Sequence, residues 1–263
     1  MQQLYRQRQS PIHRMDARVK LVFTLAFIIL LNLAPPAAWP AYILSYALLL
    51  STALLSRVGL GLVHKRALLA LPFIIAALPL VFISPPPRFT FSLFYSLKVT
   101  FSLPGLERFA SIAVRSWLSV QAAVLLAATT RFPDLLSALK SLKIPPVFVA
   151  IIGLMWRYLQ LIGEEALRML RARASRSAAP VGNSTSRHGL AWRARVTGRM
   201  AGSLLLRSLE RSDRVYAAML SRGYDGSPPV DHGNPLSRKE ILYLFCGMVL
   251  LIMIYLIALL TGA

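Results

Sequence analysis

Long apolar runs constrain this chain more than any other feature of its sequence. Five runs approach the length of a membrane span: residues 19–33, 37–55, 67–84, 109–130 and 241–260. A hydrocarbon core of roughly 30 Å needs about 20 helical residues at 1.5 Å per residue. The third run contains Pro72 and Pro79, and the fourth contains Arg115, which we interpret as reaching the outer interface. The sequence therefore predicts an all-α membrane protein with about five transmembrane helices.

Basic residues are distributed unevenly between the connections. Four Arg precede the first run and Lys20 lies at its start, and Arg57, Lys65 and Arg66 follow the second, whereas residues 34–40 contain none. The positive-inside bias therefore predicts a cytoplasmic N-terminus and, span by span, a C-terminus on the outside. The segment 131–239 is then cytoplasmic, and it carries 18 of the 30 basic residues, so most of the net charge of +20 belongs to one region.

Residues 131–238 are predicted to form a separate cytoplasmic module between an N-terminal transmembrane region, 1–130, and a last span in 239–263. A short helix is expected over 133–142. Apolar residues then recur at steps of three and four from Val147 to Leu170 and from Trp192 to Leu220. This spacing predicts two long amphipathic helices, 146–177 and 190–221, separated by a loop at 179–189 that is rich in Gly, Pro and Ser.

Each long helix ends near an arginine between two small residues. The two triplets are Ala172-Arg173-Ala174 and Ser221-Arg222-Gly223. Many arginines near helix C-termini only complement the helix dipole or follow the positive-inside rule, and we prefer that explanation for the other arginines of the segment. Small neighbours leave Arg173 and Arg222 unobstructed and allow another backbone to approach closely. We therefore predict that these two arginines dock a second protein.

Residues typical of catalysis or metal binding are missing from the sequence. The phosphate-binding pattern G-x-x-x-x-G-K-[ST] does not occur, so the chain is not expected to hydrolyse ATP itself. His13, His64, His188, His232 and the single Cys246 are too far apart for a metal-ligand pattern, and no metal or cofactor is predicted. We interpret His13 as a membrane-interface residue and the other histidines as loop residues.

Several short blocks resemble a known family. The opening SPIHRMDARVKL, residues 10–21, is similar to the "SPLHRLDPRVKL" start of the transmembrane T components of energy-coupling factor transporters, above all the CbiQ branch associated with cobalt uptake. This block holds His13, Asp16, Arg18 and Lys20; further matches lie at 135–139, 145–149, 156–158 and 218–224. Ala17 replaces a usual proline, and the triplets are not two copies of Ala-Arg-Gly, but both arginines are kept.

The resemblance implies a non-enzymatic subunit of a bacterial or archaeal inner membrane. Such a subunit joins two cytoplasmic ATP-binding-cassette ATPases to a substrate-binding membrane protein, here for cobalt or nickel. In the family two coupling helices cross as an X, and the arginine at each end enters a groove of one ATPase. The resemblance thus assigns 146–177 and 190–221 as the two arms.

Three alternatives remain at the level of sequence. The first is the same role for a vitamin such as biotin. The second is a basic, membrane-anchored module that binds nucleic acid or anionic lipid; the helical order of the arginines argues against it, and no nucleic-acid partner is expected. The third is a self-sufficient channel or secondary transporter, which needs paired polar groups within the membrane that the apolar runs do not supply.

Overall fold

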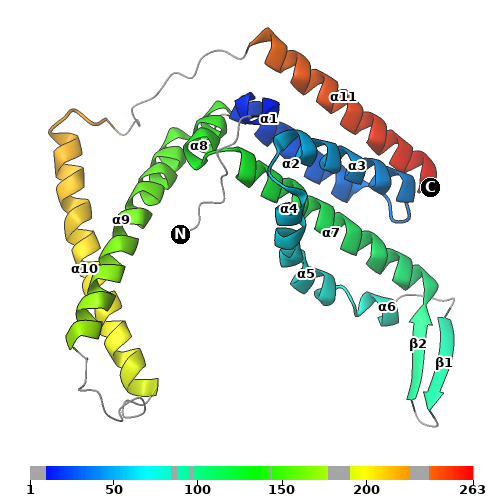
Figure 1. The fold of residues 1–263 in the computed structure, drawn as a ribbon, viewed down its shortest axis with the longest axis horizontal. Coiled ribbons are helices and arrows are strands. Elements are labelled where there is room, and N and C mark those ends of the chain that lie inside the picture. The colour runs from blue at the N-terminus through cyan, green and yellow to red at the C-terminus, as the bar shows by residue number, and fades with distance from the viewer. Residues whose placement is uncertain are drawn as a thin grey trace. The chain divides into compact units, whose positions relative to one another are not determined.

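The chain divides into two compact units. The computed structural model describes residues 10–83, 88–94, 97–142, 144–176, 190–225 and 237–262. The first unit is Met1–Ser141 with Gly233–Ala263, and the second is Leu142–His232 (Figure 1). Helices dominate both units, which confirms the predicted class of an all-α membrane protein.

The first unit is built around four helices that pack side by side: α2 (Ala17–Leu33), α3 (Trp39–Ser56), α7 (Leu103–Thr129) and α11 (Arg238–Thr261) (Figure 1). Their shared core includes Phe27, Tyr42, Leu118 and Leu251. A Cβ at Gly247 of α11 would lie 2.9 Å from a ring carbon of Phe23, so this glycine allows α11 to approach α2 closely. Many large apolar side chains of α3 and α11 are exposed, as expected for helices surrounded by lipid.

The third predicted span, which contains Pro72 and Pro79, is not one kinked helix but a series of short helices. The region consists of α4 (Leu60–Ala67), a 3₁₀ turn (Leu68–Ala70), α5 (Leu71–Ala76) and α6 (Leu80–Ile83). Pro72 occupies the first turn of α5, and Pro79 immediately precedes α6. A proline lacks the N–H that an unbroken helix needs and clashes with the preceding turn. The two prolines therefore divide the third predicted span into short consecutive helices, which pack along α7.

Four helices of the described chain are long and apolar enough to cross a membrane. They are Trp39–Ser56, Pro104–Thr129, Pro146–Arg176 and Arg238–Thr261. Three of them correspond to predicted spans. The remaining one, Pro146–Arg176, lies in the segment that the sequence analysis assigns to the cytoplasmic module. The helix α2 is one residue shorter than the shortest of these and measures about 26 Å at 1.5 Å per residue, so it needs its flanks to span.

A β-hairpin was not expected from the sequence. The strands β1 (Arg88–Phe94) and β2 (Leu97–Ser102) pair antiparallel, with Phe91 opposite Val99 and Thr90 opposite Thr100. The sequence does contain a pattern that predicts these strands, because apolar and polar residues alternate through both of them with a period of two. The hairpin leads directly into α7.

The second unit consists of α9 (Pro146–Arg176) and α10 (Leu190–Leu220), each 31 residues long. Both helices confirm the predicted ranges to within one residue, and the predicted loop at 179–189 lies outside the described residues. The short helix α8 (Phe132–Ser141) also confirms its prediction. Ala138 of α8 packs against Ala17 and Leu21 of α2, so α8 belongs to the first unit. The proposed three-part division of the chain remains a prediction.

Candidate docking sites

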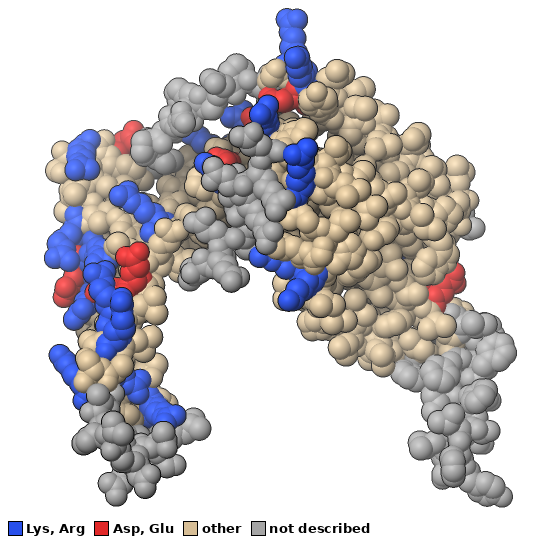
Figure 2. Space-filling view, viewed as in Figure 1, with Lys and Arg blue, Asp and Glu red and all other residues tan. Residues whose placement is uncertain are grey.

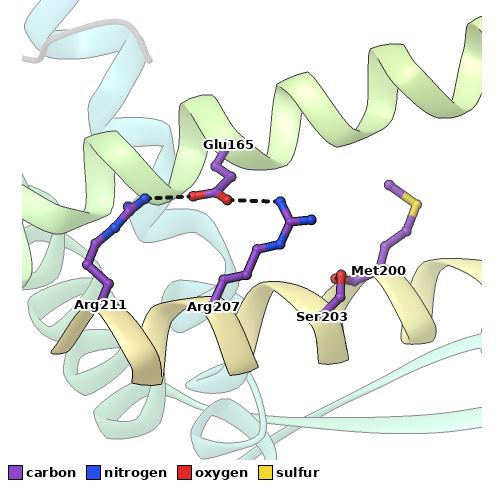
Figure 3. Close-up of polar contacts among 5 residues, drawn as sticks. All are labelled: Glu165, Met200, Ser203, Arg207 and Arg211. Carbon is purple, nitrogen blue, oxygen red and sulfur yellow. Dashed lines mark hydrogen bonds and ion pairs between the residues drawn. The ribbon is translucent and has the colours of Figure 1, made fainter. Parts of the chain in front are cut away.

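The helices α9 and α10 cross in an antiparallel arrangement. Glu165 of α9 pairs with Arg207 at 3.3 Å and with Arg211 at 3.2 Å, both on α10 (Figure 3). Nearer the end of α9, Arg173 contacts Thr197, which is nearer the start of α10. Residue numbers therefore rise on one helix as they fall on the other. Figure 1 shows the helices diverging from this crossing toward the start of α9 and the end of α10.

The Glu165 pairs hold the crossing electrostatically. Glu165 lies beyond the apolar first half of α9, and the hydrogen bond from Arg207 lowers the pKa of its carboxyl, with a further contribution from the charge of Arg211. The Arg207 side chain is 60% exposed, so solvent and salt screen this pair and its stabilising effect is small. The ion pairs therefore set the register of the two helices without locking them together.

Large apolar side chains remain exposed along both long helices. No residue of α9 is buried, and the same holds for the described side chains of α10. The exposed apolar residues are Val147, Phe148, Ile151, Met155, Leu159, Leu161, Leu167 and Leu170 on α9, and Trp192, Leu205, Leu206, Leu209, Tyr216 and Leu220 on α10. Apolar surface of this extent marks an interaction surface for a protein or a membrane.

Arg222 occupies a defined position at the end of α10. Gly223 adopts a left-handed φ of 78°, its N–H donates to the carbonyl of Leu220 at 3.0 Å, and the N–H of Tyr224 donates to Met219 at 3.0 Å. These two bonds form a Schellman motif, in which Gly223 is the C′ residue and Arg222 the C-cap. The motif fixes the backbone of Arg222, while the residue itself is exposed. Gly223 is therefore the residue that ends α10.

Arg173 lies in the last described turn of α9 and is partly covered by α10. Its guanidinium group lies 5.7 Å from the centre of the Trp192 ring, and one of its nitrogens is 3.4 Å from the Thr197 hydroxyl. Arg173 also lines an open groove of about 760 Å³ between the two helices, with Met169, Trp192 and Met200 among its apolar lining residues. Sequence reasoning treated Trp192 only as part of an apolar stripe and missed its contact with Arg173.

The two predicted docking arginines lie far apart. Arg173 contacts Thr197, and Arg222 follows Thr197 by 25 residues. At 1.5 Å per residue this separation is about 38 Å along α10. The structure therefore does not bring the two arginine triplets together; it places them at opposite ends of the two-helix unit, where Ala172 and Ala174 flank one arginine and Ser221 and Gly223 flank the other.

The N-terminal block belongs to the first unit, at the start of its helix bundle. Ser10 caps α1 (Pro11–Arg14), with its hydroxyl 2.7 Å from Nδ1 of His13, and Asp16 caps α2 by accepting from the Arg18 N–H at 2.9 Å. The Lys20 ammonium donates to the carbonyl of Thr129 at 3.3 Å and so joins α2 to the C-terminal end of α7. These contacts give the block a structural role in helix capping and packing.

Two polar clusters connect helices of the first unit. Arg115 donates to the Tyr42 hydroxyl at 2.8 Å and 2.6 Å and to the carbonyl of Asn32 at 3.4 Å, close to the end of α2. His64 lies in α4, where its Nε2 is 3.1 Å from the Tyr46 hydroxyl, so its interpretation as a loop residue was wrong. Among the described residues, no three His, Cys, Asp or Glu side chains gather at a metal-binding distance.

These observations define a multi-pass membrane protein with a separate pair of long, incompletely covered helices. In a comparison with known protein families, residues 8–232 match the family CbiQ, described as cobalt transport protein. The chain belongs to this family. The match covers the second unit and the first unit up to Ser141, with both arginine triplets, and ends before α11. The chain is therefore a membrane component of a transport system.

Three curated relatives agree with this assignment. The cobalt transport protein CbiQ of Rhodobacter capsulatus is 27% identical over 85% of this chain and 84% of its own length. The energy-coupling factor transporter transmembrane protein EcfT of Lactobacillus helveticus is 29% identical, over 83% and 78% respectively. The nickel permease LarQ of Lactiplantibacillus plantarum is 28% identical over 48% of this chain and 42% of its own length. The predicted resemblance to the T components of energy-coupling factor transporters is confirmed.

Proposed function

We propose that this chain is the non-catalytic T component of an energy-coupling factor importer for cobalt or nickel. In this proposal it joins two cytoplasmic ATPases to a substrate-binding membrane subunit, and its N-terminus lies in the cytoplasm. The observation that carries the proposal is the crossed pair of 31-residue helices, each with exposed apolar side chains and a docking arginine. The names of the CbiQ and LarQ relatives support a divalent metal as the cargo.

The separation of the arginines favours two ATPases over one. Two side chains about 38 Å apart along a helix cannot enter a single groove of one small domain. Arg173 and Arg222 would each enter a groove of a different ATPase, where a guanidinium group can form several charge-assisted hydrogen bonds. Closure of the two ATPases would then change the angle between α9 and α10, because Arg207 is 60% exposed and its ion pair across the crossing is screened by solvent.

The exposed apolar side chains provide the second half of the proposed mechanism. Phe148, Ile151 and Met155 lie on the first half of α9, away from the arginine triplets, and each is more than half exposed. We propose that this surface and the corresponding part of α10 contact the substrate-binding subunit. A change in the angle between α9 and α10 would then move their apolar surfaces relative to the substrate-binding subunit that packs against them.

Alanine variants test this assignment. Losing hydrogen bonds to a buried guanidinium costs about 1.5 to 3 kcal/mol, so Arg173→Ala and Arg222→Ala should each weaken ATPase binding roughly ten-fold or more, and the double variant should abolish assembly. The matched controls are Arg171→Ala on α9 and Arg214→Ala on α10, which remove the same charge from exposed neighbouring positions. Equal losses in the controls and the two triplet variants would refute docking by specific arginines.

A further inference from the structure

We infer that the two ends of the α9–α10 pair bind their ATPases through different kinds of interaction. The Arg173 end binds through long-range electrostatic attraction to an acidic surface, and the Arg222 end binds through short-range apolar and hydrogen-bond contacts. The inference rests on the proposed function and adds the chemistry of the partner surface at each end. The inference is drawn from the distribution of charge along the two helices. Because the helices cross antiparallel, the end of α9 lies beside the start of α10, and the two ends of the pair differ in charge.

The Arg173 end is strongly basic. Its described residues are 168–176 on α9 and 190–199 on α10, which the contact of Arg173 with Thr197 brings together. These residues include seven arginines and no aspartate or glutamate, a net charge of +7: Arg168, Arg171, Arg173, Arg176, Arg193, Arg195 and Arg199. Figure 2 shows basic side chains gathered over this part of the unit.

The Arg222 end is electrically neutral when residues 212–225 are counted. Residues 212–225 contain Arg214 and Arg222 together with Asp213 and Asp225, so two positive and two negative charges cancel. Exposed apolar side chains lie beside Arg222 instead, namely Tyr216 at 57% exposure and Leu220 at 51%. A partner surface that fits this end needs an apolar pocket and one site for a guanidinium group, with no requirement for net negative charge.

The groove beside Arg173 indicates what the basic end binds. Arg168, Arg173 and Arg176 line it together with the apolar Met169 and Trp192. The Arg173 guanidinium group lies over the Trp192 ring, so a positive charge and an apolar ring lie side by side in this groove. Charge complementarity therefore points to an ATPase surface rich in aspartate and glutamate around an apolar ridge.

The two kinds of surface respond differently to salt. Charges farther apart than a Debye length, about 8 Å at physiological ionic strength, are screened, so attraction by a field of seven arginines weakens steeply as salt rises. Such a field mainly accelerates association. Contacts of one guanidinium group and two apolar side chains change little over the same range of salt. The salt dependence of the association rate therefore distinguishes the two ends.

The test uses the full-length chain in nanodiscs of neutral lipid and its purified ATPase. Arg222→Ala leaves the basic end as the main docking site. A second variant combines Arg173→Ala with Gln at the other six arginines of the basic end and so leaves the neutral end: Arg168→Gln, Arg171→Gln, Arg176→Gln, Arg193→Gln, Arg195→Gln and Arg199→Gln. Between about 50 and 300 mM salt, association with the first variant should slow by roughly ten-fold or more, and with the second by less than about three-fold. Circular dichroism establishes that both variants keep their helices.

Each outcome has a separate meaning. Equal salt dependence of the two variants overturns the inference but leaves the proposed function standing, because both ends would still bind ATPase. If the wild-type chain binds no ATPase at any salt concentration, the proposed function itself fails. Vesicles that contain phosphatidylglycerol provide the third arm: if the basic end binds them while its association with ATPase is insensitive to salt, that end is a lipid site and the inference is wrong.

Discussion

Replacing Gly223 by alanine should release Arg222 from its fixed position without removing its charge. Gly223 holds a φ of 78° in the Schellman motif that ends α10. A Cβ at this position would meet no atom within 4 Å, so the cost of the substitution comes from the backbone alone. An alanine in the left-handed region costs about 1 to 2 kcal/mol, which corresponds to a factor of about 5 to 30 in the population of the capped conformation.

The affinity of the Arg222 end for the ATPase should therefore fall by up to about 5- to 30-fold in the Gly223→Ala variant. Binding is measured in a chain that also carries Arg173→Ala, because this change weakens ATPase binding at the Arg173 end and leaves the Arg222 end as the main contribution. Hydrogen exchange at residues 219–225 reports the motif independently and should become faster in the Gly223→Ala variant. Loss of protection without loss of binding would refute the argument that the Schellman motif positions Arg222.

A glycine in the same helix provides the matched control. Gly202 lies within α10 with no atom within 4 Å of an added Cβ, so Gly202→Ala should be neutral or stabilise the helix by about 0.5 to 1 kcal/mol. Gly223→Asn should recover part of the lost binding, because asparagine tolerates the left-handed region better than alanine.

Four further predictions concern the bundle, the helix crossing and the orientation. Arg115→Leu should lower the free energy of unfolding in detergent by about 1 to 3 kcal/mol, because the hydroxyl of buried Tyr42 loses the hydrogen bonds that it accepts from Arg115 and keeps the one that it donates to Pro35. Gly247→Leu should cost at least about 1 to 3 kcal/mol in the same assay, since α11 and α2 would be forced apart. Because the Glu165 pKa is lowered in the fold, its stabilising effect is present above the unfolded pKa and is lost as the pH falls through the lowered value. Spin-label distances between α9 and α10 should therefore increase in acid, and Glu165→Gln should remove this dependence. Cysteines introduced at 34–40 should react with impermeant reagents from outside; labelling from the cytoplasm would reverse the proposed orientation.

Local sequence patterns predicted the long helices and their ends well. Steps of three and four between apolar residues set α9 and α10, and the glycine after Arg222 marked the end of α10. Both signals are local, so they do not depend on which helices pack together. Composition at 67–84 was misleading, because Pro72 and Pro79 end helices that apolar content alone would continue.

Contacts between distant residues could not be predicted in this way. The stacking of Arg173 over Trp192 and the pairing of Glu165 with Arg207 depend on the register of the crossing between α9 and α10. The link between Arg115 and Tyr42 likewise depends on how α7 packs against α3. No spacing along the chain encodes these registers, whereas Arg173 and Arg222 stand out locally by the small residues on either side of them.

The number of ATPase subunits bound by one copy of this chain tests the central claim most directly. Native mass spectrometry of the complex purified from membranes should show two ATPases and one substrate-binding membrane protein for each copy. The double variant Arg173→Ala, Arg222→Ala should release both ATPases, while the double control Arg171→Ala, Arg214→Ala keeps them. A purified chain that transports metal with no ATPase bound, or a double variant that still holds two ATPases, would contradict the account.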